Sequence, residues 1–185
     1  MKKIAILASG NGTNAEAIIL HFKMVTKAKI ALVGSNNPQA YVLERAENHG
    51  IAHFTFDKKE FENGSVNAFL LLKGIDMIIL AGFLLRVPES IIQGFPNAIV
   101  NIHPALLPKF GGKGMYGNRV HQAVKDAGEK VTGITIHWVN ENYDEGKIIF
   151  QQEVPIDESD TPEQIAEKVH VLEHKYYPKV IESLI

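Results

Sequence analysis

The chain has 185 residues, a formal net charge of -2 and a pI near 6.4. A chain of this length buries a hydrophobic core without needing disulfides or structural metals. Its charge is nearly balanced and no basic tail or stripe is present, which argues against a general nucleic-acid-binding function. It contains no cysteine, so disulfides, thiolate metal ligands and a cysteine nucleophile are excluded.

The N-terminal segment is apolar but short. Residues 4–8 form a continuous apolar run that stops at Ser9 and Gly10. Such a run is too short to span a membrane and poorly suited to a cleavable signal peptide. We therefore expect a buried strand here, no membrane partner and a cytoplasmic location.

Short apolar runs alternate with helical patterns over the first two thirds of the chain, which predicts β-α-β units around a mostly parallel sheet. The predicted strands are residues 4–8, 30–34, 54–56, 76–81 and 98–102. The predicted helices are residues 13–22, a segment from Asn37-Pro38 to about His49-Gly50, residues 67–73 and residues 118–127.

The pattern changes in the last third. Residues 109–117 contain four glycines and no periodicity, which predicts a mobile loop. Residues 131–139 and 148–154 predict two neighbouring antiparallel strands, and a final helix opens at Thr161-Pro162-Glu163. We expect one domain over residues 1–185: an α/β, Rossmann-like three-layer sandwich whose mostly parallel sheet ends in antiparallel strands.

A glycine-rich loop connects the first predicted strand to the first predicted helix. Glycines there let the backbone turn sharply and approach a ligand closely. The free amides and the positive end of the helix dipole attract an anion, so the loop that includes Gly12, Thr13 and Asn14 is a candidate phosphate site. Thr13 and Glu16 also have the spacing of a capping box.

Two other interpretations of this loop stay open. Gly10, Gly12 and Ala15 satisfy the dinucleotide pattern G-x-G-x-x-A. That pattern needs an acidic residue at the end of the second strand to hold the ribose, and Ser35-Asn36-Asn37 stands there instead. The other interpretation is a structural turn without a ligand.

Asn101 and His103 leave the carboxyl end of a predicted buried strand, where ligands bind in open α/β sheets. Residues two apart on an extended chain point to the same side, and Pro104 favours that extended conformation at His103. An asparagine amide donates to a developing oxyanion, and a histidine moves protons near neutral pH. The pair indicates acyl-transfer chemistry. No Gly-x-Ser-x-Gly elbow is present, which disfavours a serine nucleophile.

Asp144 lies in an acidic loop between the two late strands. Four segments occur in order along the chain: Ser-Gly-Asn-Gly-Thr-Asn at 9–14, Leu-Ala-Gly-Phe at 80–83, Asn-Ile-His-Pro-Ala-Leu-Leu-Pro at 101–108 and Asp-Glu-Gly at 144–146. Together they resemble the folate-dependent formyltransferases, and in particular the phosphoribosylglycinamide formyltransferase family. The resemblance covers essentially the whole chain and implies the formyltransferase fold.

The resemblance implies transfer of a formyl group from the co-substrate 10-formyltetrahydrofolate to the amine of N1-(5-phosphoribosyl)glycinamide in purine biosynthesis. The amine attacks directly through a tetrahedral intermediate, with neither metal nor covalent enzyme intermediate. We expect small-molecule partners only, and a monomer or weak homodimer. The implied site residues are Asn101, His103 and Asp144 for catalysis; Gly12, Thr13 and Asn14 for the phosphate; Glu173 for the glycinamide; and Leu84, Leu85, Arg86, Val87, Asn140, Glu141, Asn142 and Tyr143 for the folate.

Related and unrelated functions compete with this interpretation. Methionyl-tRNA formyltransferase carries a further C-terminal domain and formyltetrahydrofolate hydrolase an N-terminal regulatory domain, so we expect neither. A ligand sensor is expected to lack one of the three catalytic residues, and an NAD-dependent oxidoreductase lacks its ribose carboxylate here. Arg86 stands one position later than the family arginine, and only Lys58 and Lys59 are candidates for the folate-tail contact.

Overall fold

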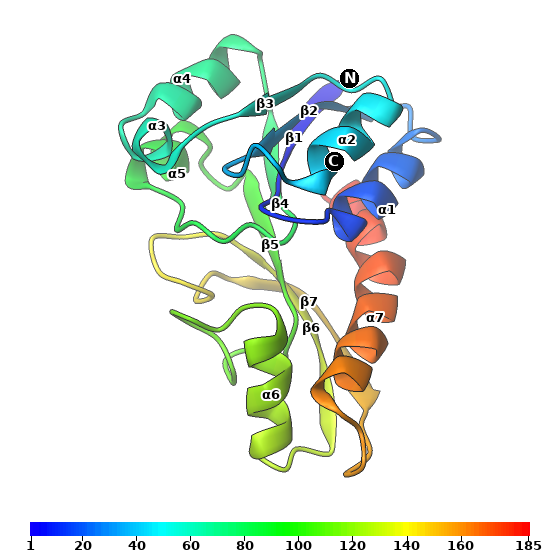
Figure 1. Ribbon diagram of the computed structural model, residues 1–185. Coiled ribbons are helices and arrows are strands. Elements are labelled where there is room, and N and C mark those ends of the chain that lie inside the picture. The colour runs from blue at the N-terminus through cyan, green and yellow to red at the C-terminus, as the bar shows by residue number, and fades with distance from the viewer.

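The computed structural model describes residues 1–185, and its centre is a seven-stranded sheet in the order β3-β2-β1-β4-β5-β6-β7 (Figure 1). The strands are β1 (Lys2–Leu7), β2 (Ala28–Ser35), β3 (His53–Thr55), β4 (Met77–Leu80), β5 (Ile99–His103), β6 (Val131–Trp138) and β7 (Ile148–Pro155). Strands β1 to β5 pair in parallel, whereas β6 pairs antiparallel with β5 and with β7. The predicted α/β class, with a late antiparallel pair, is therefore confirmed.

Helices flank this sheet. They are α1 (Thr13–Phe22), α2 (Tyr41–Asn48), α3 (Lys58–Glu62), α4 (Ser65–Leu72), α5 (Glu89–Gly94), α6 (Asn118–Asp126) and α7 (Pro162–Ser183). Figure 1 shows α1 and α2 on one side of the parallel strands and α3, α4 and α5 on the other. None of these helices is long and apolar enough to cross a membrane.

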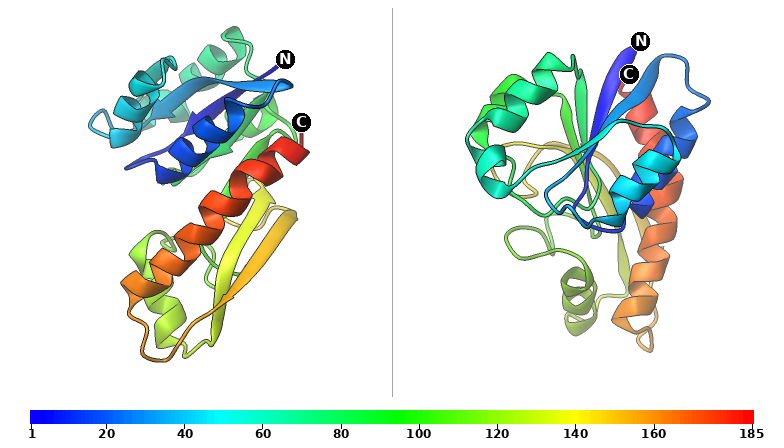
Figure 2. Two further views of the ribbon diagram at one scale, coloured as in Figure 1. Left: turned by 90° about the vertical axis from the view of Figure 1, so that its right-hand side faces the viewer. Right: turned by 45° about the horizontal axis from the view of Figure 1, so that its top comes forward.

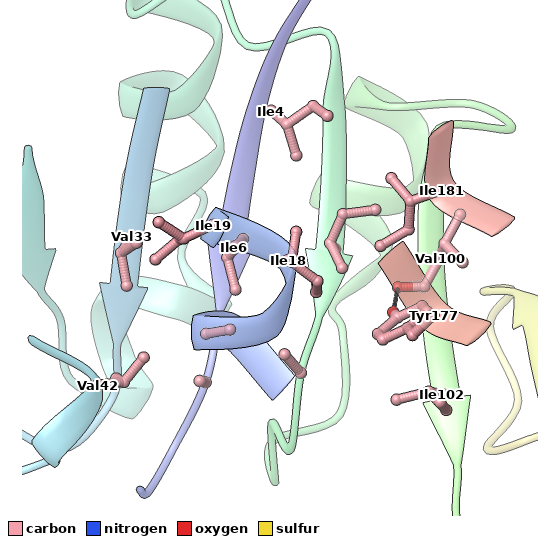
Figure 3. Packing of buried hydrophobic residues seen from close by; sticks show 14 of the residues in the cluster. Ile4, Ile6, Ile18, Ile19, Val33, Val42, Val100, Ile102, Tyr177 and Ile181 are labelled. Atoms are coloured by element: carbon pink, nitrogen blue, oxygen red, sulfur yellow. Dashed lines mark hydrogen bonds between the residues drawn. The ribbon is translucent and has the colours of Figure 1, made fainter. Parts of the chain in front are cut away.

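The first strand shows why the parallel part of the sheet is covered on both faces. Successive side chains of a strand point to opposite faces, and here both sets are apolar. Ile4 and Ile6 pack under α1, α2 and α7, whereas Ala5 and Leu7 pack under α3, α4 and α5. Figure 3 shows the first of these cores, in which Ile18 and Ile19 of α1 lie over the strands. A continuous apolar run therefore marks a strand between two helical layers.

The C-terminal helix ties the two parts of the sheet together. Helix α7 packs against α1 and α6 and against β5, β6 and β7, and Figure 2 shows it running from α6 at one end of the molecule to α1. Tyr177 of this helix is fully buried, and its hydroxyl lies 2.9 Å from the Leu80 carbonyl oxygen and 3.1 Å from that of Val100; Figure 3 shows the contact with Val100. Burial raises the pKa of Tyr177 well above its ordinary value, so the hydroxyl remains a donor to the ends of β4 and β5.

One predicted helix start is wrong, and one predicted helix cap is absent. The helix expected from Asn37-Pro38 begins at Tyr41, because Asn37 Oδ1 accepts the backbone amide of Gln39 at 3.0 Å and forms a turn first. Helix α1 begins at Thr13 as predicted, but the capping box of Thr13 and Glu16 is absent, since Gly12 is the N-cap and no side chain caps α1. Glu16 turns away from the helix end and pairs with α2 residues instead.

Two short helices are missing from the sequence-based prediction. Helices α3 and α5 have five and six residues, which is too short for a hydrophobic period to stand out. For α3 a local signal exists, because Asp57 and Glu60 form a reciprocal capping box.

Candidate active site

A single cleft of about 760 Å³ lies at the carboxyl ends of the central parallel strands. It is lined by the β1–α1 loop, the segment after β4, the end of β5, the 112–117 segment, α6, the loop before β7, and α7. All the site residues expected from the sequence line this cleft except Glu141. The fold therefore gathers segments that are more than 150 residues apart in the chain, such as Asn14 and Glu173.

The three expected catalytic residues meet at one end of β5. Asn101 and His103 point to the same side of this strand, as their spacing predicts. His103 Nδ1 lies 3.5 Å from Asp144 Oδ2, and the two side chains are only 4% and 12% exposed. The amide, the imidazole and the carboxylate thus converge in a partly dry environment, in which electrostatic interactions are strong.

His137 is a fourth polar group at this centre, and the sequence-based prediction missed it as a site residue. It stands on β6 directly opposite Asn101. Its Nδ1 lies 2.9 Å from the Trp138 carbonyl oxygen and can only donate there, so Nε2 carries the lone pair. Nε2 accepts one hydrogen of the Asn101 amide at 3.1 Å. This contact orients the Asn101 amide and leaves its second N–H free for a ligand.

The glycine-rich segment after β5 closes over the catalytic residues. The Phe110 carbonyl accepts a hydrogen bond from His103 Nε2 at 2.7 Å, and the Gly112 amide donates to Asp144 Oδ2 at 2.9 Å. Phe110 and Asp144 both have a left-handed backbone, with φ of 57° and 56°. Non-glycine residues adopt that conformation at a cost of about 1–3 kcal/mol, so the surrounding contacts hold this arrangement in place.

Burial and neighbouring groups shift the pKa values of His103 and Asp144. Burial lowers the pKa of His103, while the Asp144 carboxylate and the Phe110 carbonyl act to raise it; the pKa remains below its ordinary value. Burial alone raises the pKa of Asp144, but the charge of His103 and the hydrogen bond from the Gly112 amide hold it below its usual range. Asp144 is therefore a carboxylate at neutral pH, beside a histidine that gains a proton when negative charge develops nearby.

The expected phosphate loop is built by close backbone contact. Gly12 has a φ of +77°, and a Cβ at this position would lie 2.5 Å from Val42 Cγ2. Arg45 fixes the loop from α2 by donating to the backbone and side-chain oxygens of Asn11 at 2.9 and 2.8 Å. Gly12, Thr13 and Asn14 at the start of α1 line the cleft, and the free backbone amides of a helix start are suited to an anion.

Glu173 of α7 lies beside that loop. Its carboxylate accepts the Asn14 Nδ2 hydrogen bond at 2.9 Å, and the side chain is 7% exposed. Burial raises the pKa of Glu173, with opposing effects from Asn14 and His170. Asn14 Oδ1 is buried without a partner. The hydrogen bond between Asn14 and Glu173 thus joins the start of α1 to α7 at the cleft.

The expected folate segments lie at the other end of the cleft. Arg86 donates to the Glu141 carbonyl from Nε at 3.2 Å and from an Nη at 2.6 Å, which joins the segment after β4 to the loop before β7. Glu141 serves here through its backbone, and its side chain does not line the cleft. Val87 is buried in the core, whereas Leu84 is 52% exposed. Leu84 is therefore more accessible than Val87 as an apolar contact for the ring of the expected folate ligand.

Basic residues of the cleft differ from those expected. Lys58 and Lys59 belong to α3 and do not line it. Lys113 and Arg119, from the glycine-rich segment and α6, line it instead. No local pattern in the sequence marks them, because only the path of the chain after β5 brings them to the cleft.

The class of protein follows from a comparison with protein families. A family model described as "Formyl transferase" matches residues 2–181. The chain belongs to this family.

Individual relatives are more specific. The phosphoribosylglycinamide formyltransferase of Bacillus subtilis is 44% identical, and the alignment covers 100% of this chain and 95% of the relative. Among solved structures, the phosphoribosylglycinamide formyltransferase of Bacillus halodurans superposes with a TM-score of 0.90 at 38% identity, over 99% of this chain and 95% of that one. Glycinamide ribonucleotide transformylase 1 of Geobacillus kaustophilus superposes with a TM-score of 0.91 at 35% identity, over 100% and 98%.

Proposed function

We propose that this protein transfers the formyl group of 10-formyltetrahydrofolate to the amine of N1-(5-phosphoribosyl)glycinamide, a step of purine biosynthesis. The observation that carries the proposal is the convergence of Asn101, His103 and Asp144 in the cleft of a chain that belongs to the formyl transferase family. Its relatives of 44% and 38% identity bear the name of this activity.

The two ends of the cleft suit the two substrates. The ribonucleotide phosphate binds the amides of Gly12, Thr13 and Asn14, with Glu173 beside the glycinamide. The folate ring binds along Leu84 and the residues near it, against the loop that contains Tyr143. This arrangement brings the amine and the formyl carbon together near His103, and such positioning supplies a large part of the rate.

Asn101 and His103 act on the tetrahedral intermediate. As the amine attacks the formyl carbon, the carbonyl oxygen becomes an oxyanion. The free N–H of Asn101 donates to that oxygen. His103 Nδ1 takes the proton that the amine releases, and the resulting imidazolium stabilises the oxyanion while Asp144 stabilises the imidazolium. The same proton then passes to the folate nitrogen as its bond to the formyl carbon breaks.

The test is a formyl-transfer assay on the full chain, with 10-formyltetrahydrofolate in the presence and absence of the ribonucleotide. We expect deformylation that depends on the ribonucleotide, and a product whose mass has increased by one formyl group. Deformylation without the ribonucleotide identifies a hydrolase instead. If folded protein turns over neither way, the proposal is wrong.

A further inference from the structure

We infer that His121 donates a hydrogen bond to an oxygen atom of the ribonucleotide and thereby sets the affinity for this substrate. The inference rests on the function proposed above. His121 lies in α6, outside the sequence motifs that predicted the other site residues. It is nevertheless 2% exposed and lines the cleft.

The two nitrogens of the His121 ring differ in their surroundings. Nδ1 is sealed from solvent and has no hydrogen-bond partner. Nε2 is not sealed in this way, and His121 is one of the residues that line the cleft. A buried N–H without an acceptor is less tolerable than an unpaired lone pair. The proton of the neutral ring therefore lies on Nε2, and His121 offers a donor to whatever occupies the cleft.

The ring remains neutral at the pH of the cell. Burial is the main cause that lowers the pKa of His121 to about 4, and the charges of His170 and His103 add to it. An imidazolium would also need an acceptor at Nδ1, where none is present. His121 is thus suited to donating one hydrogen bond and not to transferring protons.

The titratable neighbours of His121 belong to α7 and to the reaction centre. The titratable groups that act on it are His170 of α7 and His103 of β5. His170 Nε2 lies 4.0 Å from Glu173, which accepts the hydrogen bond from Asn14 of the phosphate loop. His121 thus shares the cleft with His103 of the reaction centre and with His170 and Glu173 of α7, and on the proposed function we expect the ribonucleotide to bind along these residues.

The unpaired nitrogen also has a consequence for stability. A buried polar atom without a partner destabilises the folded state. Leucine fills a similar volume without that penalty, so His121→Leu is expected to leave the melting temperature unchanged or to raise it. A residue that serves packing alone would not carry an unpaired polar atom that destabilises the fold. We infer that the hydrogen bond to the substrate explains why a histidine stands at this position.

The experiment compares His121→Leu, His121→Gln and, as a control, His53→Leu on the exposed strand β3. For His121→Leu we expect KM for the ribonucleotide to rise about tenfold, the effect of one lost hydrogen bond to a polar or charged oxygen. We expect kcat and the folate KM to stay within about twofold. His121→Gln places an amide donor near the position of Nε2 and should keep most of the wild-type affinity. The control should match the wild type.

Three results overturn the inference: an unchanged ribonucleotide KM in His121→Leu, a rise confined to the folate KM, or equal losses in the Leu and Gln variants together with a lower melting temperature. Calorimetric titration of the ribonucleotide into each variant gives the same comparison without turnover. If the wild type fails to transfer formyl groups, the proposed function is wrong, whereas an active wild type with an indifferent His121→Leu variant refutes only the role of His121.

Discussion

Asp144→Asn tests the reaction centre most directly, because it removes a charge and keeps the shape. The carboxylate lies 3.5 Å from His103 Nδ1, and both side chains are nearly buried. At an effective dielectric constant of about 20, two unit charges at that separation attract each other by roughly 5 kcal/mol. The neutral amide retains part of the hydrogen bonding. We therefore expect the activation free energy to rise by roughly 3–4 kcal/mol, which lowers kcat by about 10²–10³.

The pH profile should change in a defined direction. Burial lowers the pKa of His103, and the charge of Asp144 is the largest of the effects that oppose it. Without that charge the pKa of His103 falls further, so the imidazolium forms only at more acidic pH. The limb of the kcat profile that reports His103 should move toward acid in Asp144→Asn.

The assay is steady-state formyl transfer at saturating concentrations of both substrates, over a range of pH. Glu145→Gln is the matched control, because it makes the same chemical change at the next residue, whose side chain is exposed and does not line the cleft. A kcat of Asp144→Asn within tenfold of the wild type, or an equal loss in Glu145→Gln, would refute the reasoning.

Three further predictions concern binding and stability. Gly12→Ala meets Val42 at 2.5 Å and has an unfavourable φ of +77°, so we expect at least a roughly tenfold rise in KM for the ribonucleotide and a stability loss of about 1–3 kcal/mol; an unchanged KM would move the phosphate site. Tyr177→Phe removes the donor to the Leu80 and Val100 carbonyls and should cost roughly 1–3 kcal/mol in urea denaturation. Because the pKa of His121 is lowered to about 4 from 6.5, the unfolded chain binds that proton first and stability falls as pH drops through this window. Between about pH 7 and 4.5, the free energy of unfolding measured in urea should fall by roughly 2 kcal/mol less in His121→Leu than in the wild type. An equal fall in both proteins would show that His121 does not titrate this way.

The sequence alone determined much of the fold, for reasons that are local. The continuous apolar run that begins at Ile4 predicted a strand between two helical layers, because both of its faces must be covered. The spacing of Asn101 and His103 predicted side chains on one side of a strand, because the period of a strand is two residues. Motif order also pointed to the formyl transferase family, whose model matches residues 2–181. The short helices α3 and α5 were not predicted, since five or six residues are too few to show a hydrophobic period.

Only the tertiary structure decided which polar groups share the cleft. His137 orients Asn101 because the pairing of β5 with β6 places the two residues opposite each other, and pairing partners are not encoded in either strand by itself. His121 reaches the cleft because α6 packs against α7, and its unpaired Nδ1 exists only in that packed environment. The pKa values of His103 and Asp144 likewise depend on burial and on neighbours distant in the chain. Local patterns determine the elements and their periods, whereas contacts between distant segments determine the electrostatics and hydrogen bonding of the site.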